Sequence, residues 1–315
     1  MQNNQIIEKI IQLKKHKHAV ILAHYYQYGE IQDIADFVGD SLDLSRKSAE
    51  TEAKIIVFAG VQFMAETAKI LSPSKKVLIP DPEAGCSLAD SCSYTDFKSF
   101  MDKYPDRIVV SYVNTTAEIK TLTDITCTST NAKQVIDSIP REKEIIFAPD
   151  RNLGNYLNGI TGRNMVLWDG ACHVHEEFSL EKILDIKQEY PKAKIIAHPE
   201  CQKPIQIAAD FIGSTSALLH FTETNKSNEF IVATESGILH QMQKRNPDKL
   251  FIPAPPIDST CGCNDCKYMK IHTVQKIYDS LLYERHKVEL SAEVIDKARI
   301  PIQRMFKLSN QPIKT

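Results

Sequence analysis

Two stretches far apart in the chain are nearly the same: Ile34–Ser41 reads IADFVGDS, and Ala208–Thr215 reads AADFIGST. His24 stands 15 positions before the glycine of the first stretch, and His198 stands 15 positions before the glycine of the second. The offset between the two copies is 174 positions throughout. A constant offset between matching segments is the signature of an internal repeat. The chain is therefore predicted to contain copies of one structural unit.

A third, weaker copy lies between these two. Tyr112 precedes Ser129 by 17 positions, the spacing that also separates His24 from Ser41 and His198 from Thr215. The middle copy is offset by 88 positions from the first and by 86 from the third. We call His24, Tyr112 and His198 the anchor residues of the three copies. A polar residue stands two positions after each anchor, and these residues are Tyr26, Asn114 and Glu200. Three matched copies predict three similar units.

The apolar runs of each copy are short and nearly continuous, which is typical of parallel strands that are buried on both faces. The runs that carry the anchors are Ala19–Ala23, Ile108–Val113 and Lys194–Ala197. The later runs are Ile55–Ala59, Ile145–Ala148 and Phe230–Ala233, followed by Val77–Ile79, Met165–Trp168 and Leu250–Ile252. Helix-period segments precede the copies at Gln5–Lys14, Tyr94–Lys103 and Leu180–Tyr190. Each unit is expected to read α-β-α-α-β-α-β.

The predicted fold class is α/β, with three pseudo-symmetric repeats that each form a three-layer αβα unit with a short parallel sheet, around a central iron–sulfur site. The expected boundaries are residues 1–88, 89–175 and 176–266 for the repeats. Residues 267–315 are expected to form a helical tail that packs on the repeats, with Pro301 and Pro312 as helix breakers.

Composition excludes several functional classes. Of the 315 residues, 43% are hydrophobic and 25% are charged, and the net charge is −2, which is ordinary for a globular protein. The basic residues are spread along the chain, so neither nucleic acid nor a membrane surface is an expected partner. No apolar run approaches the roughly 18–20 residues of a spanning helix, and Met1–Lys17 is polar, so a cytoplasmic location is expected.

The eight cysteines are not expected to form a disulfide framework, because the cytosol is reducing. Cys86 and Cys172 each follow the last strand of a repeat and lie 86 positions apart, and the run Cys261–Cys266 follows the last strand of the third. Ligands gather beyond the carboxyl ends of parallel strands, so three units around a pseudo-threefold axis would bring three thiols together. Three thiols suit an iron–sulfur cluster with one iron that the protein does not hold, whereas a structural zinc site has four ligands.

The remaining cysteines are assigned to other roles. Cys92 and Cys127 are interpreted as structural, whereas Cys201 could act as a ligand but follows a first strand and not a last one. The spacing Cys-x-Cys-x-x-Cys is ambiguous on its own, and a supporting or redox role is favoured for Cys261 and Cys263 over ligation.

Helix starts supply a second hypothesis. Ser41, Ser129 and Thr215 are natural N-caps, but helix N-termini also bind anions, so three converging starts would suit a substrate with several carboxylates or a phosphate. The segment His173–Glu177 (HVHEE) resembles a metal cluster, yet a polar helix start is the favoured interpretation.

The motifs together resemble the quinolinate synthase family, the A protein of NAD biosynthesis. The matching segments run in order over nearly the whole chain: AHYYQ (23–27), GDSL (39–42), FMAE (63–66), PDPEAGCSLAD (80–90), YVNT (112–115), CTS (127–129), HPEC (198–201), GSTS (213–216) and Cys266 followed by YMK (268–270). Lys267 stands where the family pattern has proline and His272 where it has asparagine, which puts only the local loop geometry in doubt.

The resemblance implies an enzyme that condenses iminosuccinate (iminoaspartate) with dihydroxyacetone phosphate to quinolinate, with loss of phosphate and two waters. It implies a 4Fe-4S cluster held by Cys86, Cys172 and Cys266. The positions that match the family's substrate site are His24, Ser41, Tyr112, Val113, Asn114, Ser129, His198, Pro199, Glu200 and Thr215, and Tyr26 matches a tyrosine of the same pocket. A transient contact with the enzyme that supplies iminosuccinate is a further expected partnership.

The expected mechanism uses the open iron as a Lewis acid that polarises a substrate oxygen. Glu200 and His198 are the acid–base candidates, and Tyr26 is expected to assist isomerisation. Two alternatives stay open from the sequence. One is a three-domain radical iron–sulfur enzyme of the diphthamide-synthesis type, which would require S-adenosylmethionine. The other is a non-catalytic metal-binding or redox-sensing protein.

Overall fold

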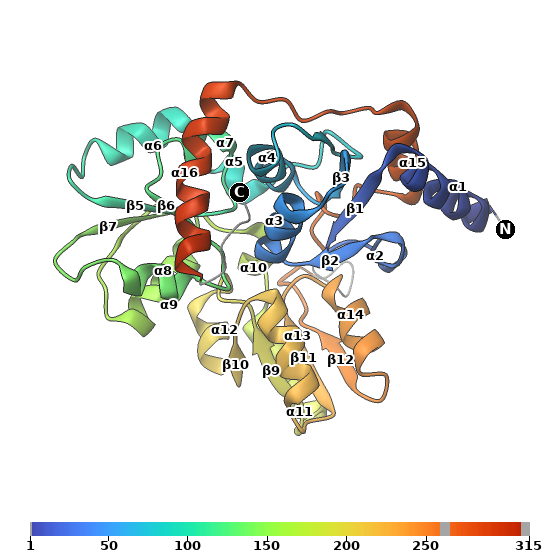
Figure 1. Ribbon diagram of the computed structural model, residues 1–315. Helices are drawn as coiled ribbons and strands as arrows, with labels where there is room; N and C mark the ends of the chain where they lie inside the picture. Colours follow the sequence, from blue (N-terminus) through green and yellow to red (C-terminus); the bar gives the residue numbers. More distant parts are fainter. Residues whose placement is uncertain (1, 259–264, 310–315) are drawn as a thin grey trace.

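Three four-stranded parallel sheets form three lobes around a common centre in the computed structural model, which describes residues 2–258 and 265–309 (Figure 1). The strand orders are β2-β1-β3-β4, β6-β5-β7-β8 and β10-β9-β11-β12, so all three sheets have the same topology. Each pairing within them is parallel. The α/β class with three αβα repeats is confirmed.

The elements of the first lobe alternate strictly between helix and strand. They are α1 (Gln2–Lys17), β1 (Ala19–His24), α2 (Gly29–Ile34), β2 (Phe37–Gly39), α3 (Ser41–Glu50), β3 (Ile55–Ala59), α4 (Gln62–Leu71) and β4 (Lys76–Leu78). Every residue of β3 is buried, as expected for a central strand that is covered by helices on both faces.

The second lobe repeats this pattern with one additional short helix at its start. Its elements are α5 (Ser87–Asp90), α6 (Tyr94–Met101), β5 (Ile108–Tyr112), α7 (Ala117–Lys120), β6 (Ile125–Cys127), α8 (Ala132–Ser138), β7 (Ile145–Ala148), α9 (Arg151–Thr161) and β8 (Val166–Leu167).

The third lobe again begins with a short additional helix. Its elements are α10 (His173–Glu176), α11 (Leu180–Glu189), β9 (Lys194–Ala197), α12 (Lys203–Ala208), β10 (Phe211–Ile212), α13 (Thr215–Thr224), β11 (Glu229–Ala233), α14 (Ile238–Arg245) and β12 (Leu250–Pro253).

The predicted unit α-β-α-α-β-α-β was wrong in one respect, because each repeat contains a fourth strand between its second and third helices. These edge strands, β2, β6 and β10, have only two or three residues, which is too short for a periodic pattern. Their pairing with β1, β5 and β9 depends on contacts between segments that are distant in sequence.

One aspartate fixes the edge strand in every repeat. Asp36 Oδ2 accepts from the Ile21 amide at 2.7 Å, and the equivalent carboxylates of Asp124 and Asp210 accept from the first strands of their repeats at 2.9 Å. In each copy the two residues are 15 positions apart. The backbone amide of the same aspartate donates back to the first strand. This reciprocal pairing explains why the aspartate recurs before each edge strand.

The tail beyond the third lobe contains α15 (Val274–Tyr283) and α16 (Ala292–Leu308). Helix α15 lies beside α1, and α16 packs on α7 and β6 of the second lobe and on α4 of the first (Figure 1). Pro301 was predicted to break a helix, but it lies inside α16, buried, and its carbonyl accepts from Thr126 Oγ1 at 3.2 Å. Its packing against β6 compensates for the backbone hydrogen bond that proline cannot donate. Pro312 lies outside the described residues.

The three repeat boundaries and the tail boundary stay predictions, since sheets alone do not define where one repeat ends. None of the helices in residues 2–258 and 265–309 combines the length with the apolar character that crossing a membrane requires.

Candidate active site

The three anchor residues meet in one pocket at the carboxyl ends of the sheets. His24 is the last residue of β1, Tyr112 is the last residue of β5, and His198 directly follows β9. The pocket is lined by side chains from all three repeats: His24, Tyr26, Asp40, Ser41, Val61, Phe63, Met64, Gly85, Cys86, Ser87, Tyr112, Asn114, Thr128, Ser129, Cys172, His173, Val174, His175, His198, Glu200, Thr215, Cys266, Tyr268 and Met269. The strand order places these loops at the centre because parallel strands direct all their carboxyl ends to the same edge.

Most of the sequence-predicted substrate residues line this pocket. Val113 and Pro199 do not contribute to the described lining. Val113 is buried with its amide bonded to the Cys127 carbonyl at 2.8 Å, and the Pro199 carbonyl accepts from Gln206. Asn114 Oδ1 is buried without a hydrogen-bond partner among the described residues. An unpaired buried acceptor costs free energy unless a ligand completes it, so Asn114 is suited to contact one.

The predicted N-caps lie one or two residues away from the true ones. Asp40 caps α3 by accepting from two backbone amides, and Ser214 caps α13, while Asn131 precedes α8. Ser41 and Thr215 are therefore the first residues inside their helices, with hydroxyls that are not used for capping. Both residues line the pocket together with Ser129. The N-caps were misassigned because the cap residue and its neighbours are all polar at these three helix starts. Only the backbone dihedrals show which of them is the cap.

Three thiols enter the pocket from three separate segments. Cys86 precedes α5, Cys172 precedes α10, and Cys266 precedes the tail, and each is partly buried. Burial raises the pKa of Cys86 to about 12 and that of Cys266 to about 11, and it raises the pKa of Cys172 well above its usual value. Thiols in such an apolar site become thiolates only when a cation compensates their charge, so this donor set fits a metal cluster with three protein ligands.

The other described cysteines do not join this group. Cys92 and Cys127 are buried in the hydrophobic core, and Cys201 is buried with its thiol donating to the Ala233 carbonyl at 3.3 Å. Cys261 and Cys263 lie outside the described residues.

Glu200 is a fully buried carboxylate with close partners. The Tyr112 hydroxyl donates to its Oε1 at 2.5 Å, and His175 Nδ1 lies 3.1 Å from its Oε2. Burial by itself would raise the pKa of Glu200, but the imidazoles of His198 and His175 and the two hydrogen bonds to it outweigh burial and lower the pKa. Glu200 is therefore ionised at neutral pH, which makes it a proton acceptor.

His24 and His198 are neutral, and both present the same ring edge to the pocket. Burial lowers the pKa of His24 to about 4 and that of His198 to about 3. The amide of Tyr26 donates to His24 Nδ1 at 3.2 Å, and the amide of Glu200 donates to His198 Nδ1 at 3.4 Å. Because Nδ1 accepts in both rings, Nε2 carries the proton. Each histidine is thus a neutral hydrogen-bond donor, and His198 Nε2 lies 3.2 Å from Ser129 Oγ.

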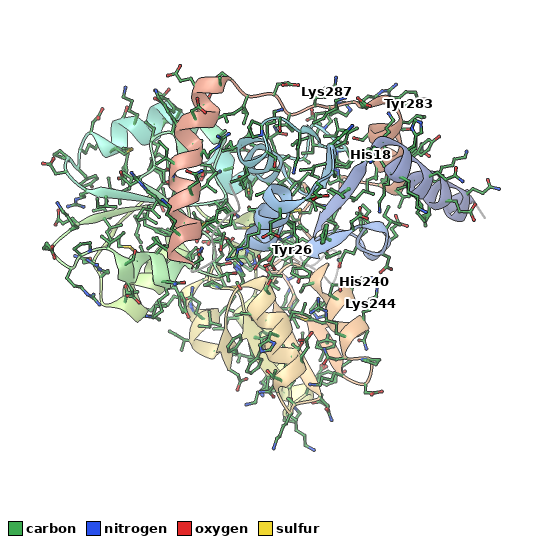
Figure 2. The ribbon with its side chains drawn as sticks, in the orientation of Figure 1. His18, Tyr26, His240, Lys244, Tyr283 and Lys287 are labelled. Atoms are coloured by element: carbon green, nitrogen blue, oxygen red, sulfur yellow. The ribbon has the colours of Figure 1, made fainter. Side chains whose placement is uncertain are left out.

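Tyr26 lies where the first repeat meets the third (Figure 2). Its hydroxyl is 3.0 Å from Thr215 Oγ1 and 2.8 Å from Thr234 Oγ1. Burial raises the pKa of Tyr26 well above its usual value, and the Glu200 carboxylate adds to that rise, so the phenol stays protonated.

His175 is a site residue that the sequence interpretation missed. A helix does begin at His173, as expected, but the interpretation of HVHEE as only a polar start was wrong for His175, which is buried beside Glu200. Single ligand atoms of Cys172, His175 and Glu200 lie within 4.8 Å of one another and could hold a metal ion. The sequence feature that could have identified His175 is its spacing of three residues from Cys172, which places both on one helical turn.

No lysine or arginine occurs among the described residues that line the pocket. Anionic groups of a ligand would therefore be bound by neutral donors, namely hydroxyls, imidazole N–H groups and the amides of helix starts. Such donors orient an anion without the strong affinity of a fixed positive charge.

Comparison with known proteins identifies the chain's relatives. The family model described as "Quinolinate synthetase A protein" matches residues 8–307. The chain is similar to proteins named "Quinolinate synthase" from Thermosynechococcus vestitus, with 55% identity over 304 residues, and from Chloroherpeton thalassium, with 53% identity over 304 residues. These alignments cover 96% of this chain and 95% and 94% of the relatives. The relative of the same name from Nostoc sp. is 56% identical over 298 residues, which is 95% of this chain and 92% of that protein.

Proposed function

This chain belongs to the quinolinate synthetase A protein family, and from that membership we propose that it is a quinolinate synthase, an enzyme of NAD biosynthesis. The proposed reaction condenses iminosuccinate with dihydroxyacetone phosphate and releases phosphate and two waters. The observation that carries this proposal within the structure is the convergence of three thiols and an ionised glutamate in one pocket built by three repeats. No observation favours the radical enzyme or the redox sensor.

The proposed cofactor is a 4Fe-4S cluster held by Cys86, Cys172 and Cys266, which supplies a Lewis-acidic iron corner when it is bound. The three thiols would each bind one of the four irons, and no fourth cysteine lies among the described residues that line the pocket. His175 and Glu200 lie beside Cys172, so they border the space next to that ligand.

Substrate binding is assigned to the neutral donors of the pocket. The hydroxyls of Ser41, Ser129 and Thr215 and the Nε2 protons of His24 and His198 face the same space. Two carboxylates and a phosphate require several donors at once, and donors from three repeats approach from different directions. The side chain of Asn114 offers an amide and an unpaired oxygen for the remaining polar groups.

Proton transfer is assigned to Glu200 and Tyr26. Glu200 is ionised, so it accepts a proton from substrate carbon or nitrogen, and Tyr112 holds one of its oxygens in place. Tyr26 is protonated and assists isomerisation. His198 was predicted to be an acid–base residue as well. Because its imidazole is neutral and carries its proton on Nε2, we assign it to orienting the substrate. Contact with the enzyme that supplies iminosuccinate stays a prediction.

The decisive test is an anaerobic assay for quinolinate from the two small substrates, performed on protein with its iron content measured. Glu200→Gln should lower kcat by about 10²–10⁴-fold, the usual contribution of a positioned base, and should keep the iron. The matched control is Glu142→Gln at an exposed position, which should remain fully active. If the wild type forms no quinolinate, the proposed function is wrong; if Glu200→Gln turns over normally, Glu200 is not the base.

A further inference from the structure

One threonine outside the pocket lining connects two polar side chains that line the pocket. Thr234 Oγ1 lies 2.8 Å from the Tyr26 hydroxyl and 3.0 Å from His175 Nε2. Tyr26 comes from the first repeat, His175 lies in α10 between the second and third sheets, and Thr234 directly follows β11. Thr234 is 2% exposed, so water does not compete for these hydrogen bonds.

The direction of each hydrogen bond follows from the chemistry of its partners. His175 Nδ1 lies 3.1 Å from Glu200 Oε2 without the alignment of a hydrogen bond, and because the carboxylate would repel a ring lone pair, Nδ1 carries the imidazole proton. His175 Nε2 then has a free lone pair and accepts the single proton of the Thr234 hydroxyl. Thr234 Oγ1 in turn accepts the proton of the Tyr26 hydroxyl. With its own proton donated to Thr234, the Tyr26 oxygen accepts the proton of the Thr215 hydroxyl, which lies 3.0 Å away and belongs to a residue of the pocket lining.

We propose that Thr234 is a positioning residue for the reaction, whose hydroxyl sets the orientation of the Tyr26 hydroxyl and the ring of His175. This inference rests on the proposed function, because it assigns a role in that reaction. It makes the Tyr26 oxygen a hydrogen-bond acceptor on its Thr215 side. It also keeps His175 turned toward Glu200, so two neighbouring groups of the pocket lining depend on one hydroxyl.

The internal repeats show that the fold itself does not require this hydroxyl. Ala59, Ala148 and Ala233 occupy equivalent places, since each pairs with the same position of the first strand in its sheet. The residue that follows is Gly60 in the first repeat and Pro149 in the second. Three different residues thus follow equivalent positions at the ends of equivalent strands. Only the third repeat carries a side chain there that reaches Tyr26 and His175.

A set of substitutions at one position separates positioning from packing. Thr234→Val keeps the shape and removes the hydroxyl, while Thr234→Ser keeps the hydroxyl and removes a methyl group. Thr222→Val is the matched control, because Thr222 is a buried threonine of the same repeat whose hydroxyl donates to the Leu219 carbonyl at 2.7 Å, away from the pocket. All variants are purified anaerobically, and iron content, thermal midpoint, kcat and KM are measured.

The expected result is a kcat for Thr234→Val that is about 10–100-fold below wild type, because small misplacements of reacting groups cost that much. KM should change by less than about threefold, because the substitution disturbs the geometry of the reacting groups and does not remove a contact that binds the substrate. Iron content should equal that of wild type, and Thr234→Ser should recover activity to within about threefold of wild type. Thr222→Val should leave kcat unchanged.

Two results would overturn the inference while leaving the proposed function intact. One is a Thr234→Val enzyme with wild-type kcat. The other is a Thr234→Ser enzyme as slow as Thr234→Val, which would assign the effect to the methyl group and to packing. If Thr234→Val yields no folded protein, Thr234→Ala takes its place in the same comparison with Thr234→Ser. A wild-type enzyme without quinolinate formation would instead reject the proposed function itself.

Discussion

At the scale of single residues, the chemistry of the site depends on how burial shifts the pKa values of its different polar groups. The three thiols, the two neutral histidines and the ionised Glu200 lie within one enclosed space, yet their pKa values move in different directions. Burial penalises every charge, and Glu200 has enough donors around it to stay ionised. The result is a buried carboxylate beside neutral donors, a suitable arrangement for removing a proton from a bound anion.

Cys86→Ala tests the metal assignment directly. Loss of one of three ligands should remove the cluster, so iron content and quinolinate formation should both fall to near background. Cys92→Ala is the matched control, since Cys92 is a buried cysteine of the same region that packs in the core. Its iron content should match wild type. A Cys86→Ala protein that keeps its full iron content and its activity would show that Cys86 is not a ligand.

At the scale of secondary-structure elements, the ends of helices decide local stability. Helix α9 ends in Gly162, whose φ of +65° lies in the left-handed region, and the α9 interior contains Gly159 on an exposed face. A Cβ added at either glycine would meet no atom within 4 Å, so only backbone preference differs between them.

Substitution by alanine at these two glycines should therefore have opposite effects. Gly162→Ala should destabilise the protein by about 1 kcal/mol, because alanine is strained at positive φ. Gly159→Ala should stabilise it by roughly 0.5–1 kcal/mol through helix propensity. Urea unfolding measures both changes. Two changes of the same sign would contradict the assigned end of α9.

One carboxylate of the tail pairs with two lysines of the first repeat. Glu284 follows α15 and pairs with Lys17 of α1 at 3.0 Å and with Lys76 of β4. Hydrogen bonds from Lys76 and then Lys17 lower the pKa of Glu284 from 4.5 to about 2. A carboxylate with a lowered pKa stabilises the fold above its unfolded pKa, and this contribution is lost as pH falls from about 4.5 toward 2.

Glu284→Gln should accordingly destabilise the protein at neutral pH by about 0.2–1 kcal/mol, since the pairs are partly exposed and screened. The difference from wild type should shrink as pH falls below about 4.5 and vanish near pH 2. Unfolding midpoints measured across this pH range provide the check, with Glu142→Gln as an exposed control. A difference that persists unchanged at pH 2 would exclude this ion pair as its cause.

At the scale of the whole molecule, the pocket exists only while the first and third repeats stay docked. At the interface between these two repeats, Gln32 donates to the Gly237 carbonyl at 2.9 Å and accepts from Gln241 at 2.9 Å. At its surface, Asp33 accepts from His240 at 3.0 Å and from Lys244 at 2.7 Å (Figure 2). These contacts hold Tyr26 against Thr215 and Thr234.

Gly237 lies against the backbone of the first repeat at this interface. A Cβ at Gly237 would lie 2.7 Å from the Tyr26 carbonyl carbon and 2.8 Å from the Tyr25 oxygen. Backbone atoms cannot rotate away, so Gly237→Ala should push the repeats apart, lower stability by about 1–3 kcal/mol and raise KM. Unfolding and steady-state kinetics measure the two effects, with Gly159→Ala as the alanine control. Unchanged KM and stability in Gly237→Ala would show that the interface is adaptable.

Much of this arrangement was predictable from local sequence. Matched spacings around His24, Tyr112 and His198 predicted three α/β units, and the offset between Cys86 and Cys172 predicted thiols at equivalent places. These predictions succeed because identical units place equivalent positions at equivalent points of the fold, and parallel strands direct their carboxyl ends to one edge. The repeated aspartate before each edge strand belongs to the same class of local signal.

Only tertiary structure decided the rest. The edge strands, the continuous helix through Pro301 and the use of Asp40 and Ser214 as caps depend on contacts that no short pattern encodes. The same holds for His175 and Thr234, which are ordinary polar residues in sequence and become site residues because three separately encoded units dock. Hydrophobic periodicity acts over a few residues, whereas the direction of a buried hydrogen bond depends on every group packed around it.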